Sequence, residues 1–170
     1  FLSELWLTET ENIQLHNYNK DFDIFTSYAK KGMSGRPYRG TALMIRKTLP
    51  TPELIFQDDY ATIARIKSNN FSILIAGVYL QCITNIPNYR EIYSMQLANI
   101  GGIIKQFQAS SETLVLGDFQ CCPSTFNSER IYKTNALSTL LNEFISNLGL
   151  IPIDITKGTG PNYTYQHHTL

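Results

Sequence analysis

The residues best suited to chemistry in this sequence follow a short apolar run. Residues 114–116, Leu-Val-Leu, predict a short buried strand, and Gly117 then lets the chain turn. Asp118 and Gln120 place a carboxylate and an amide at the C-terminal end of that strand. Ligands of open α/β sheets bind at this end, where a carboxylate can accept a proton from water or fix its direction. The segment therefore predicts a functional site, with a turn aspartate after a core strand as the alternative.

Two further polar residues lie at or near the ends of predicted strands. Glu4 lies in the apolar segment 1–6, which predicts a strand end carrying an acid. One glutamate at a strand end suits Mg²⁺, which prefers one or two carboxylates together with water and substrate phosphate oxygens. Tyr79 lies near the end of the longest β-rich run, and its hydroxyl could donate to developing negative charge. The residue types alone leave an exposed acid and a packed tyrosine as alternatives.

A loop between residues 30 and 40 carries two arginines. Three glycines and a proline in this stretch predict the loop. Arg36 and Arg39 could meet phosphate groups as charge-assisted donors, and the alternative is a pair of solvated loop arginines.

The strands that must position these residues are predicted from β-rich runs. Residues 21–28 roughly alternate polar and apolar side chains, and 41–46 resume a strand after the arginine loop. Residues 60–66 and 71–80 predict a hairpin, because the adjacent asparagines between them tolerate the positive φ of a tight turn.

Two helices and two late strands complete the predicted elements. Residues 87–107 predict a helix with Tyr93, Leu97, Ile100, Ile104 and Phe107 at helical spacing. Residues 135–148 carry apolar side chains on one helical face and are followed by Gly149, which predicts an amphipathic helix that ends at this glycine. Residues 152–155 and 162–165 predict the final strands. This mixture of helices and strands predicts a layered α/β domain.

The composition limits the classes of protein that fit. At 170 residues the chain predicts one domain, and 43% hydrophobic with 16% charged residues is typical of a globular protein. Lys+Arg and Asp+Glu balance at 14 each, which argues against a non-specific nucleic-acid binder. Three cysteines, two of them adjacent, favour a reducing compartment over a disulfide framework or a zinc site. No apolar stretch reaches the about 18 residues of a membrane span, so we expect no membrane association.

Four segments, in this order, resemble the endonuclease/exonuclease/phosphatase superfamily, and most closely the endonuclease domains of non-LTR retrotransposons. They are residues 2–7 (Leu-Ser-Glu-Leu-Trp-Leu), 35–42 (Gly-Arg-Pro-Tyr-Arg-Gly-Thr-Ala), 78–80 (Val-Tyr-Leu) and 116–120 (Leu-Gly-Asp-Phe-Gln). A fifth, 163–165 (Tyr-Thr-Tyr), is similar to the strand that precedes the family's C-terminal motifs. The resemblance spans the whole chain and implies an α/β fold, an incomplete four-layer sandwich of two β-sheets flanked by helices.

The resemblance also implies roles for individual residues. Glu4 matches the acidic ligand of Mg²⁺ or Mn²⁺, and Asp118 matches the aspartate that orients and activates water. Tyr79 matches a tyrosine at the scissile phosphate, and Thr164 a threonine near the substrate phosphate. Gln120 stands where the family has a phosphate-contacting asparagine, and its extra methylene displaces the amide. Since misplacement of a catalytic group by about 1 Å can lower the reaction rate about 100-fold, we expect impaired activity.

The implied function is a metal-dependent phosphodiesterase that nicks DNA, fused to or derived from a reverse transcriptase polyprotein, intracellular and nuclear. The alternatives are a phosphatase or lipid phosphodiesterase of the same superfamily, and a non-catalytic binding domain. The chain begins at Phe1 without Met and stops at Leu170, so we expect a fragment of a single domain, truncated at both ends. The family's catalytic histidine motif would follow Leu170, and we therefore expect these 170 residues alone to be inactive or nearly so.

Overall fold

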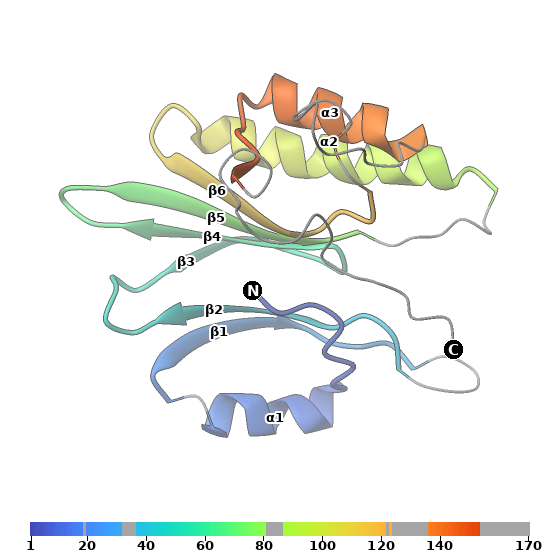
Figure 1. The fold of residues 1–170 in the computed structure, drawn as a ribbon. Helices are drawn as coiled ribbons and strands as arrows, with labels where there is room; N and C mark the ends of the chain where they lie inside the picture. Colours follow the sequence, from blue (N-terminus) through green and yellow to red (C-terminus); the bar gives the residue numbers. More distant parts are fainter. Residues whose placement is uncertain (19, 32–36, 81–86, 122, 124–135, 154–170) are drawn as a thin grey trace. The chain divides into compact units, whose positions relative to one another are not determined.

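The computed structural model describes residues 1–18, 20–31, 37–80, 87–121, 123 and 136–153 (Figure 1). The chain forms two compact units, Phe1–Gln120 and Cys121–Leu170. All the described strands and two of the described helices belong to the first unit, which holds the candidate site.

The first unit begins with a small antiparallel sheet. Strand β1 (Phe22–Ser27) pairs with β2 (Thr41–Arg46), as the alternation of the sequence predicts. A bridge between Lys30 and Tyr38 extends this hairpin beyond the two strands. On the other side of β2, Leu2 and Ala42 exchange backbone hydrogen bonds of 2.8 and 2.9 Å. The small sheet therefore anchors both the N-terminal segment and the arginine loop.

The N-terminal segment is not the strand end that the sequence predicts at Glu4. Only Leu2 pairs with β2, and the backbone then turns through φ values of 55° at Glu4 and 53° at Trp6. Helix α1 (Glu9–Tyr18), which the sequence analysis missed, follows directly. Thr8 caps it, because the Thr8 hydroxyl and backbone N–H both donate to the Glu11 carboxylate, at 2.6 and 2.9 Å.

A four-stranded sheet forms the second layer of strands. Its order is β3 (Glu53–Gln57), β4 (Ala61–Lys67), β5 (Ser72–Tyr79) and β6 (Glu112–Asp118). The first three strands are antiparallel, and the predicted hairpin of β4 and β5 is confirmed. Strand β3 was not predicted. Strands β5 and β6 run parallel, so their C-terminal ends lie side by side at one end of the sheet.

Helix α2 (Tyr89–Phe107) connects the two parallel strands, as a parallel pair requires. Its buried side chains include four residues of the predicted stripe, Tyr93, Leu97, Ile100 and Ile104, while the fifth, Phe107, is only partly buried. The Tyr93 hydroxyl donates to the carbonyl oxygen of Phe119 at 2.9 Å, which ties the helix to the segment after β6. Among the described residues, no helix has the length and apolar character needed to cross a bilayer.

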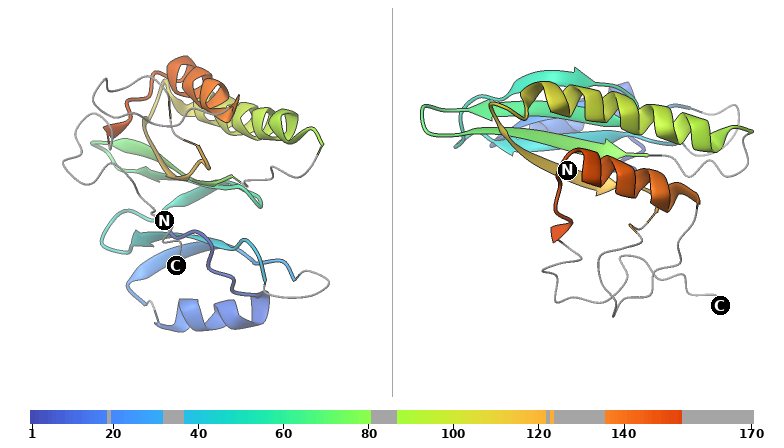
Figure 2. Two further views of the ribbon diagram at one scale, coloured as in Figure 1. Left: turned by 45° about the vertical axis from the view of Figure 1, so that its right-hand side comes forward. Right: turned by 90° about the horizontal axis from the view of Figure 1, so that it is seen from above.

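The two sheets of the first unit pack face to face. Leu43 and Ile45 of β2 meet Ala64 and Ile66 of β4 in one apolar cluster, with Phe1, Phe25 and Ile75 packed against it. Helix α1 lies against the outer side of the small sheet and α2 covers the outer side of the large one (Figures 1 and 2). The predicted α/β fold of two β-sheets flanked by helices is confirmed.

Strand β6 corrects one detail of the sequence analysis. The strand exists where residues 114–116 predict it, but the expectation that it is buried is wrong, since Leu114 is 44% exposed. The reason is its place in the sheet: within the described residues β6 pairs only with β5 and forms an edge. An apolar run alone does not distinguish an edge strand from a central one.

The second unit contains helix α3 (Ala136–Asn147), whose buried face includes Leu137, Leu141, Phe144 and Ile145. The helix ends as predicted at Gly149, where φ is 61°. The N–H groups of Gly149 and Leu150 donate to the carbonyls of Ser146 and Ile145, at 3.1 and 3.0 Å, which is a glycine-terminated helix end. The predicted strand 162–165 and half of the predicted strand 152–155 lie outside the described residues, and the described half, Pro152 and Ile153, does not form a strand.

Candidate active site

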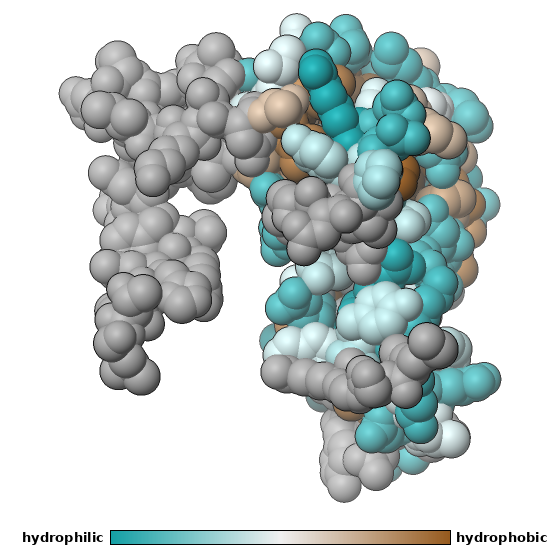
Figure 3. All heavy atoms as spheres, turned by 90° about the vertical axis from the view of Figure 1, so that its right-hand side faces the viewer, coloured by the Kyte–Doolittle hydropathy of each residue, from teal (hydrophilic) through white to brown (hydrophobic). Residues whose placement is uncertain are grey.

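The candidate site lies where β5 and β6 end. Tyr79 and Asp118 are paired in the parallel register, and the N–H of Leu80 donates to the carbonyl oxygen of Asp118 at 2.9 Å. Gly117 is required here, because a Cβ at this position would lie 1.8 Å from the carbonyl oxygen of Val78. Figure 3 shows the molecule from the side toward which both strands run, and the described side chains there are mainly hydrophilic.

Glu4 reaches the C-terminal ends of β5 and β6 because the N-terminal segment packs over β5. The Phe1 ring lies against Gly77, where an added Cβ would come within 2.3 Å of the ring. Beyond Glu4, the N–H groups of Leu5 and Trp6 donate to the carbonyl oxygens of Gly40 and Arg39, at 3.0 and 3.1 Å. Glu4 is therefore held between two anchored stretches of backbone, one before it and one after it.

The Tyr79 hydroxyl donates a hydrogen bond of 2.7 Å to Oε1 of Glu4. Burial raises the pKa of Tyr79 well above its usual range, and the hydrogen bond to Glu4 and the negative charges of Glu4 and Asp118 raise it further. The positive charge of Arg39 acts in the opposite direction. Four of the residues singled out by the sequence analysis, Glu4, Tyr79, Asp118 and Arg39, thus act on one another, and Tyr79 is a hydrogen-bond donor at neutral pH.

Gln120 binds Asp118. The backbone N–H of Gln120 donates to Oδ1 of Asp118 at 2.9 Å, and its side-chain amide donates to Oδ2 at 2.6 Å. The backbone of Gln120 has a φ of 56°, which folds the residue back toward the aspartate. The longer side chain thus directs its amide onto the neighbouring carboxylate and orients it.

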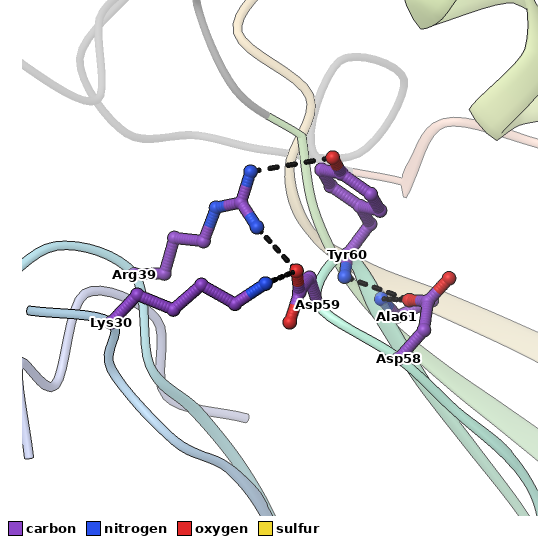
Figure 4. A network of polar contacts seen from close by, with 6 residues as sticks. All are labelled: Lys30, Arg39, Asp58, Asp59, Tyr60 and Ala61. Atoms are coloured by element: carbon purple, nitrogen blue, oxygen red, sulfur yellow. Dashed lines mark hydrogen bonds and ion pairs between the residues drawn. The ribbon is translucent and has the colours of Figure 1, made fainter. Parts of the chain in front are cut away.

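Arg39 is not a solvated loop arginine, which corrects one alternative from the sequence. Its side chain is 12% exposed and forms an ion pair of 2.5 Å with Asp59 (Figure 4). It also donates to the Tyr60 hydroxyl at 3.3 Å, and its guanidinium lies 4.9 Å from the centre of the Tyr60 ring and 5.6 Å from that of Tyr38. The predicted substrate contacts Arg36 and Thr164 lie outside the described residues.

The residues that hold Arg39 were not predicted from the sequence. Asp59 and Tyr60 lie in the turn between β3 and β4, and Lys30 forms a second ion pair with Asp59. The only local signal is the pair Asp58-Asp59 before a predicted strand, which indicates a turn and nothing more. No sequence spacing links this turn to an arginine 20 residues earlier.

The chemistry of these groups fits a divalent metal ion. Glu4 is exposed and directs one carboxylate oxygen to Tyr79, and Asp118 supplies a second exposed carboxylate at the same edge. Mg²⁺ is commonly held by one or two carboxylates, with water and substrate phosphate completing its coordination. Glu4 is the residue that would hold the ion, beside the hydroxyl of Tyr79.

Comparisons with known proteins show similarity in fold. No protein-family model matches the chain, and a search of curated proteins gave no match. Two solved structures of NExo from Neisseria match over 85% of this chain, with TM-scores of 0.55 and 0.56 and identities of 13% and 14%. One is described as a 3′-5′ exonuclease from Neisseria meningitidis, the other as a 3′ phosphatase bound to a product DNA hairpin.

TDP2 from D. rerio, complexed with a single-strand DNA product, matches over 89% of this chain with a TM-score of 0.50 and 15% identity. The chain spans a little over half of each of these solved chains, namely 59% and 58% of the two NExo structures and 51% of TDP2. At such low identities the likeness is one of fold.

Proposed function

We propose, from the endonuclease/exonuclease/phosphatase superfamily fold of this chain, that it is a metal-dependent phosphodiesterase domain acting on DNA. The observation that carries the proposal is the 2.7 Å hydrogen bond from the Tyr79 hydroxyl to Glu4, beside Asp118 at the end of two parallel strands. The superfamily's metal-binding glutamate, phosphate-contacting tyrosine and water-orienting aspartate are the residue types that these three positions carry.

Each of these residues has a distinct part in the proposed chemistry. Glu4 would hold Mg²⁺ or Mn²⁺, and a bound divalent ion supplies charge neutralisation at the scissile phosphate. Tyr79 remains protonated, and its single hydroxyl proton, which Glu4 accepts in this structure, would instead be donated to a phosphate oxygen as negative charge develops there. Asp118 accepts a proton from the attacking water or fixes its direction, while Gln120 orients the Asp118 carboxylate.

The substrate is the less direct part of the proposal. A DNA substrate is supported by the DNA products bound in the TDP2 and NExo structures. Arg36 and Thr164 are proposed substrate contacts on the family resemblance alone. Nicking of target DNA as part of a reverse-transcriptase polyprotein, in the nucleus, belongs to the same proposal and rests on the same resemblance.

A second candidate function has an observation of its own. The NExo structure with the highest of the three TM-scores reported above, 0.56, is described as a 3′ phosphatase. The same three residues could remove a terminal phosphate, because metal, tyrosine and aspartate act on the phosphoryl group whatever the leaving group is. The substrate therefore has to be measured.

The experiment is a side-by-side assay with the natural protein that contains this chain. Supercoiled plasmid, a 3′-phosphorylated oligonucleotide and a phosphoinositide are each incubated with Mg²⁺. We expect nicking of the plasmid, reduced about 100-fold or more by Asp118→Ala. Release of phosphate without nicking would replace the first candidate by the second. A non-catalytic binding domain would be supported by two results together. The wild-type protein would turn over none of the three substrates, and a Glu4→Ala, Asp118→Ala double variant would bind DNA as well as the wild type does.

A further inference from the structure

The turn between β3 and β4 is connected to both halves of the Glu4–Tyr79 pair. Asp58 makes this turn rigid: its Oδ1 accepts from the N–H groups of Tyr60 and Ala61, at 2.7 and 2.8 Å (Figure 4). The next residue, Asp59, is therefore presented from a fixed backbone. Its carboxylate receives both Lys30 and Arg39.

One connection runs from this turn directly to Tyr79. The carbonyl oxygen of Tyr60 accepts the backbone N–H of Tyr79 at 2.8 Å, at the end of the β4–β5 ladder. The position of Tyr79 along its strand is thus tied to the turn by a backbone hydrogen bond. This connection does not depend on any charged side chain.

The other connection runs through Arg39 to the segment that carries Glu4. Asp59 and Tyr60 hold the guanidinium, and the backbone of Arg39 and Gly40 accepts the N–H groups of Trp6 and Leu5. Arg39 has a φ of 70°, and Glu4 and Trp6 have φ values of 55° and 53°. Backbone in this left-handed region persists at non-glycine residues only where the surroundings hold it.

The ion pair, more than the packing alone, fixes Arg39. Its guanidinium is largely removed from solvent, and a charge in such a place needs a counter-charge and hydrogen-bond acceptors. Asp59 supplies the counter-charge. Lys30 is 50% exposed and can be solvated without Asp59, so its ion pair matters less for the position of the loop.

We propose that Asp59 is a positioning residue, which acts through Arg39 to set the place of the Glu4 carboxylate relative to the Tyr79 hydroxyl. This inference rests on the proposed function insofar as it assigns Glu4 to a metal ion. The two connections start from one turn: its backbone holds Tyr79, and the Asp59 carboxylate ties to it, through Arg39, the segment that carries Glu4, 75 residues away in sequence. Asp59 itself touches neither substrate nor metal in this account.

The test compares Asp59→Asn with Glu53→Gln as a matched control. Glu53 forms an arginine pair of 2.6 Å with Arg65 in the same sheet, so both variants remove one carboxylate charge from an arginine pair. Two properties are measured on the 170-residue chain: hydrogen exchange of the Leu5 and Trp6 amides, and quenching of tryptophan fluorescence by Mn²⁺. Trp6 is the one tryptophan of the sequence and lies two residues from Glu4, so its emission reports on this site.

We expect Asp59→Asn to speed exchange of the Leu5 and Trp6 amides, and to raise the Mn²⁺ concentration for half-maximal quenching, each by about tenfold, the factor for one modest interaction. Glu53→Gln should change neither by more than about twofold, the level of an exposed pair. Asp59→Glu, which keeps the charge, should restore part of the Mn²⁺ affinity. Wild-type exchange and Mn²⁺ affinity in Asp59→Asn would overturn the inference.

The outcomes separate this inference from the proposed function. No saturable quenching in the wild-type chain would count against a metal site at Glu4, while amide exchange would still test the role of Asp59. If Asp59→Asn does not fold, Arg39→Lys takes its place, because lysine keeps the charge but cannot make the forked contacts. Unchanged exchange of the Leu5 and Trp6 amides in Arg39→Lys would then overturn the inference.

Discussion

The hydroxyl of Tyr79 donates to Oε1 of Glu4 at 2.7 Å, although the two residues are 75 positions apart in sequence. Tyr79 ends a central strand, and Glu4 lies in a non-extended segment held by the arginine loop. The contact therefore exists only because two separately anchored pieces of backbone converge at one edge of the large sheet. This convergence brings an acid to the place where ligands of such sheets bind.

Removing the Tyr79 hydroxyl should affect activity far more than stability. We expect Tyr79→Phe to lower the rate of phosphodiester cleavage about 100- to 1,000-fold, the usual effect of deleting one donor to developing negative charge. Glu4 is exposed and can be solvated, so the loss in unfolding free energy should be only about 1 kcal/mol. Cleavage rates and urea unfolding check this, with Tyr38→Phe at an exposed ring as control. Equal activity of the two variants would contradict the role of Tyr79.

Tyr79 should titrate at a higher pH than an ordinary tyrosine. Burial and the neighbouring acids raise its pKa above the ordinary value of about 10. A raised folded-state pKa means that the folded protein keeps this proton longer than the unfolded chain. The resulting stabilisation is fully present below about pH 10 and is lost as the pH rises through the folded-state value. Tyrosinate absorbance during a pH titration should show a late component that is smaller in Tyr79→Phe. A late component of unchanged size in this variant would belong to another tyrosine.

Gln120 should influence turnover more than binding. Its amide is engaged with Asp118, so Gln120→Ala removes the orientation of the carboxylate and not a substrate contact. We expect kcat to fall about tenfold with KM changed less than about twofold, since an interaction felt only in the transition state changes kcat. Steady-state kinetics of plasmid nicking would measure both constants. A raised KM at unchanged kcat would instead assign the amide to the substrate phosphate.

Two glycines should respond in opposite ways to alanine. At Gly117 a Cβ would lie 1.8 Å from the carbonyl oxygen of Val78, and φ is 145°, so Gly117→Ala should cost about 3 kcal/mol or more of unfolding free energy. At Gly102 in α2 a Cβ meets nothing within 4 Å, so Gly102→Ala should add about 0.5–1 kcal/mol. Urea denaturation measures both. Similar midpoints for the two variants would show that the close approach of β5 and β6 is not required.

The sequence predicts those elements of the fold whose side-chain pattern is local, and it does not predict features that depend on the tertiary arrangement. The stripes of α2 and α3 are local, and both helices are found within a few residues of their predicted ends. Helix α1 has no apolar stripe, and its signal is the capping pattern of Thr8 and Glu11, which the periodicity does not contain. The exposure of Leu114 depends on which strand lies at the edge, and an apolar run carries no information about that.

The residues of the candidate site also divide into those that the sequence predicts and those that depend on tertiary structure. Glu4, Tyr79 and Asp118 are identified from motifs whose order is visible in the sequence, and the structure brings them together. The pairing of Arg39 with Asp59 arises only when the arginine loop folds against the β3–β4 turn. The local chemistry of Asp58 and Asp59 indicates a turn, while their function depends on a partner supplied by the other sheet.

The Mg²⁺ dependence of DNA nicking by Glu4→Gln tests the central claim most directly. Glutamine keeps an acceptor for the Tyr79 hydroxyl but loses the charge that would hold the ion. In the natural protein that contains this chain, we expect Glu4→Gln to raise the Mg²⁺ concentration for half-maximal nicking about tenfold or more, which is at least the effect of losing a residue that only supports a metal ligand. An Mg²⁺ dependence identical to that of the wild type would contradict a metal site at Glu4, and with it the proposed phosphodiesterase centre.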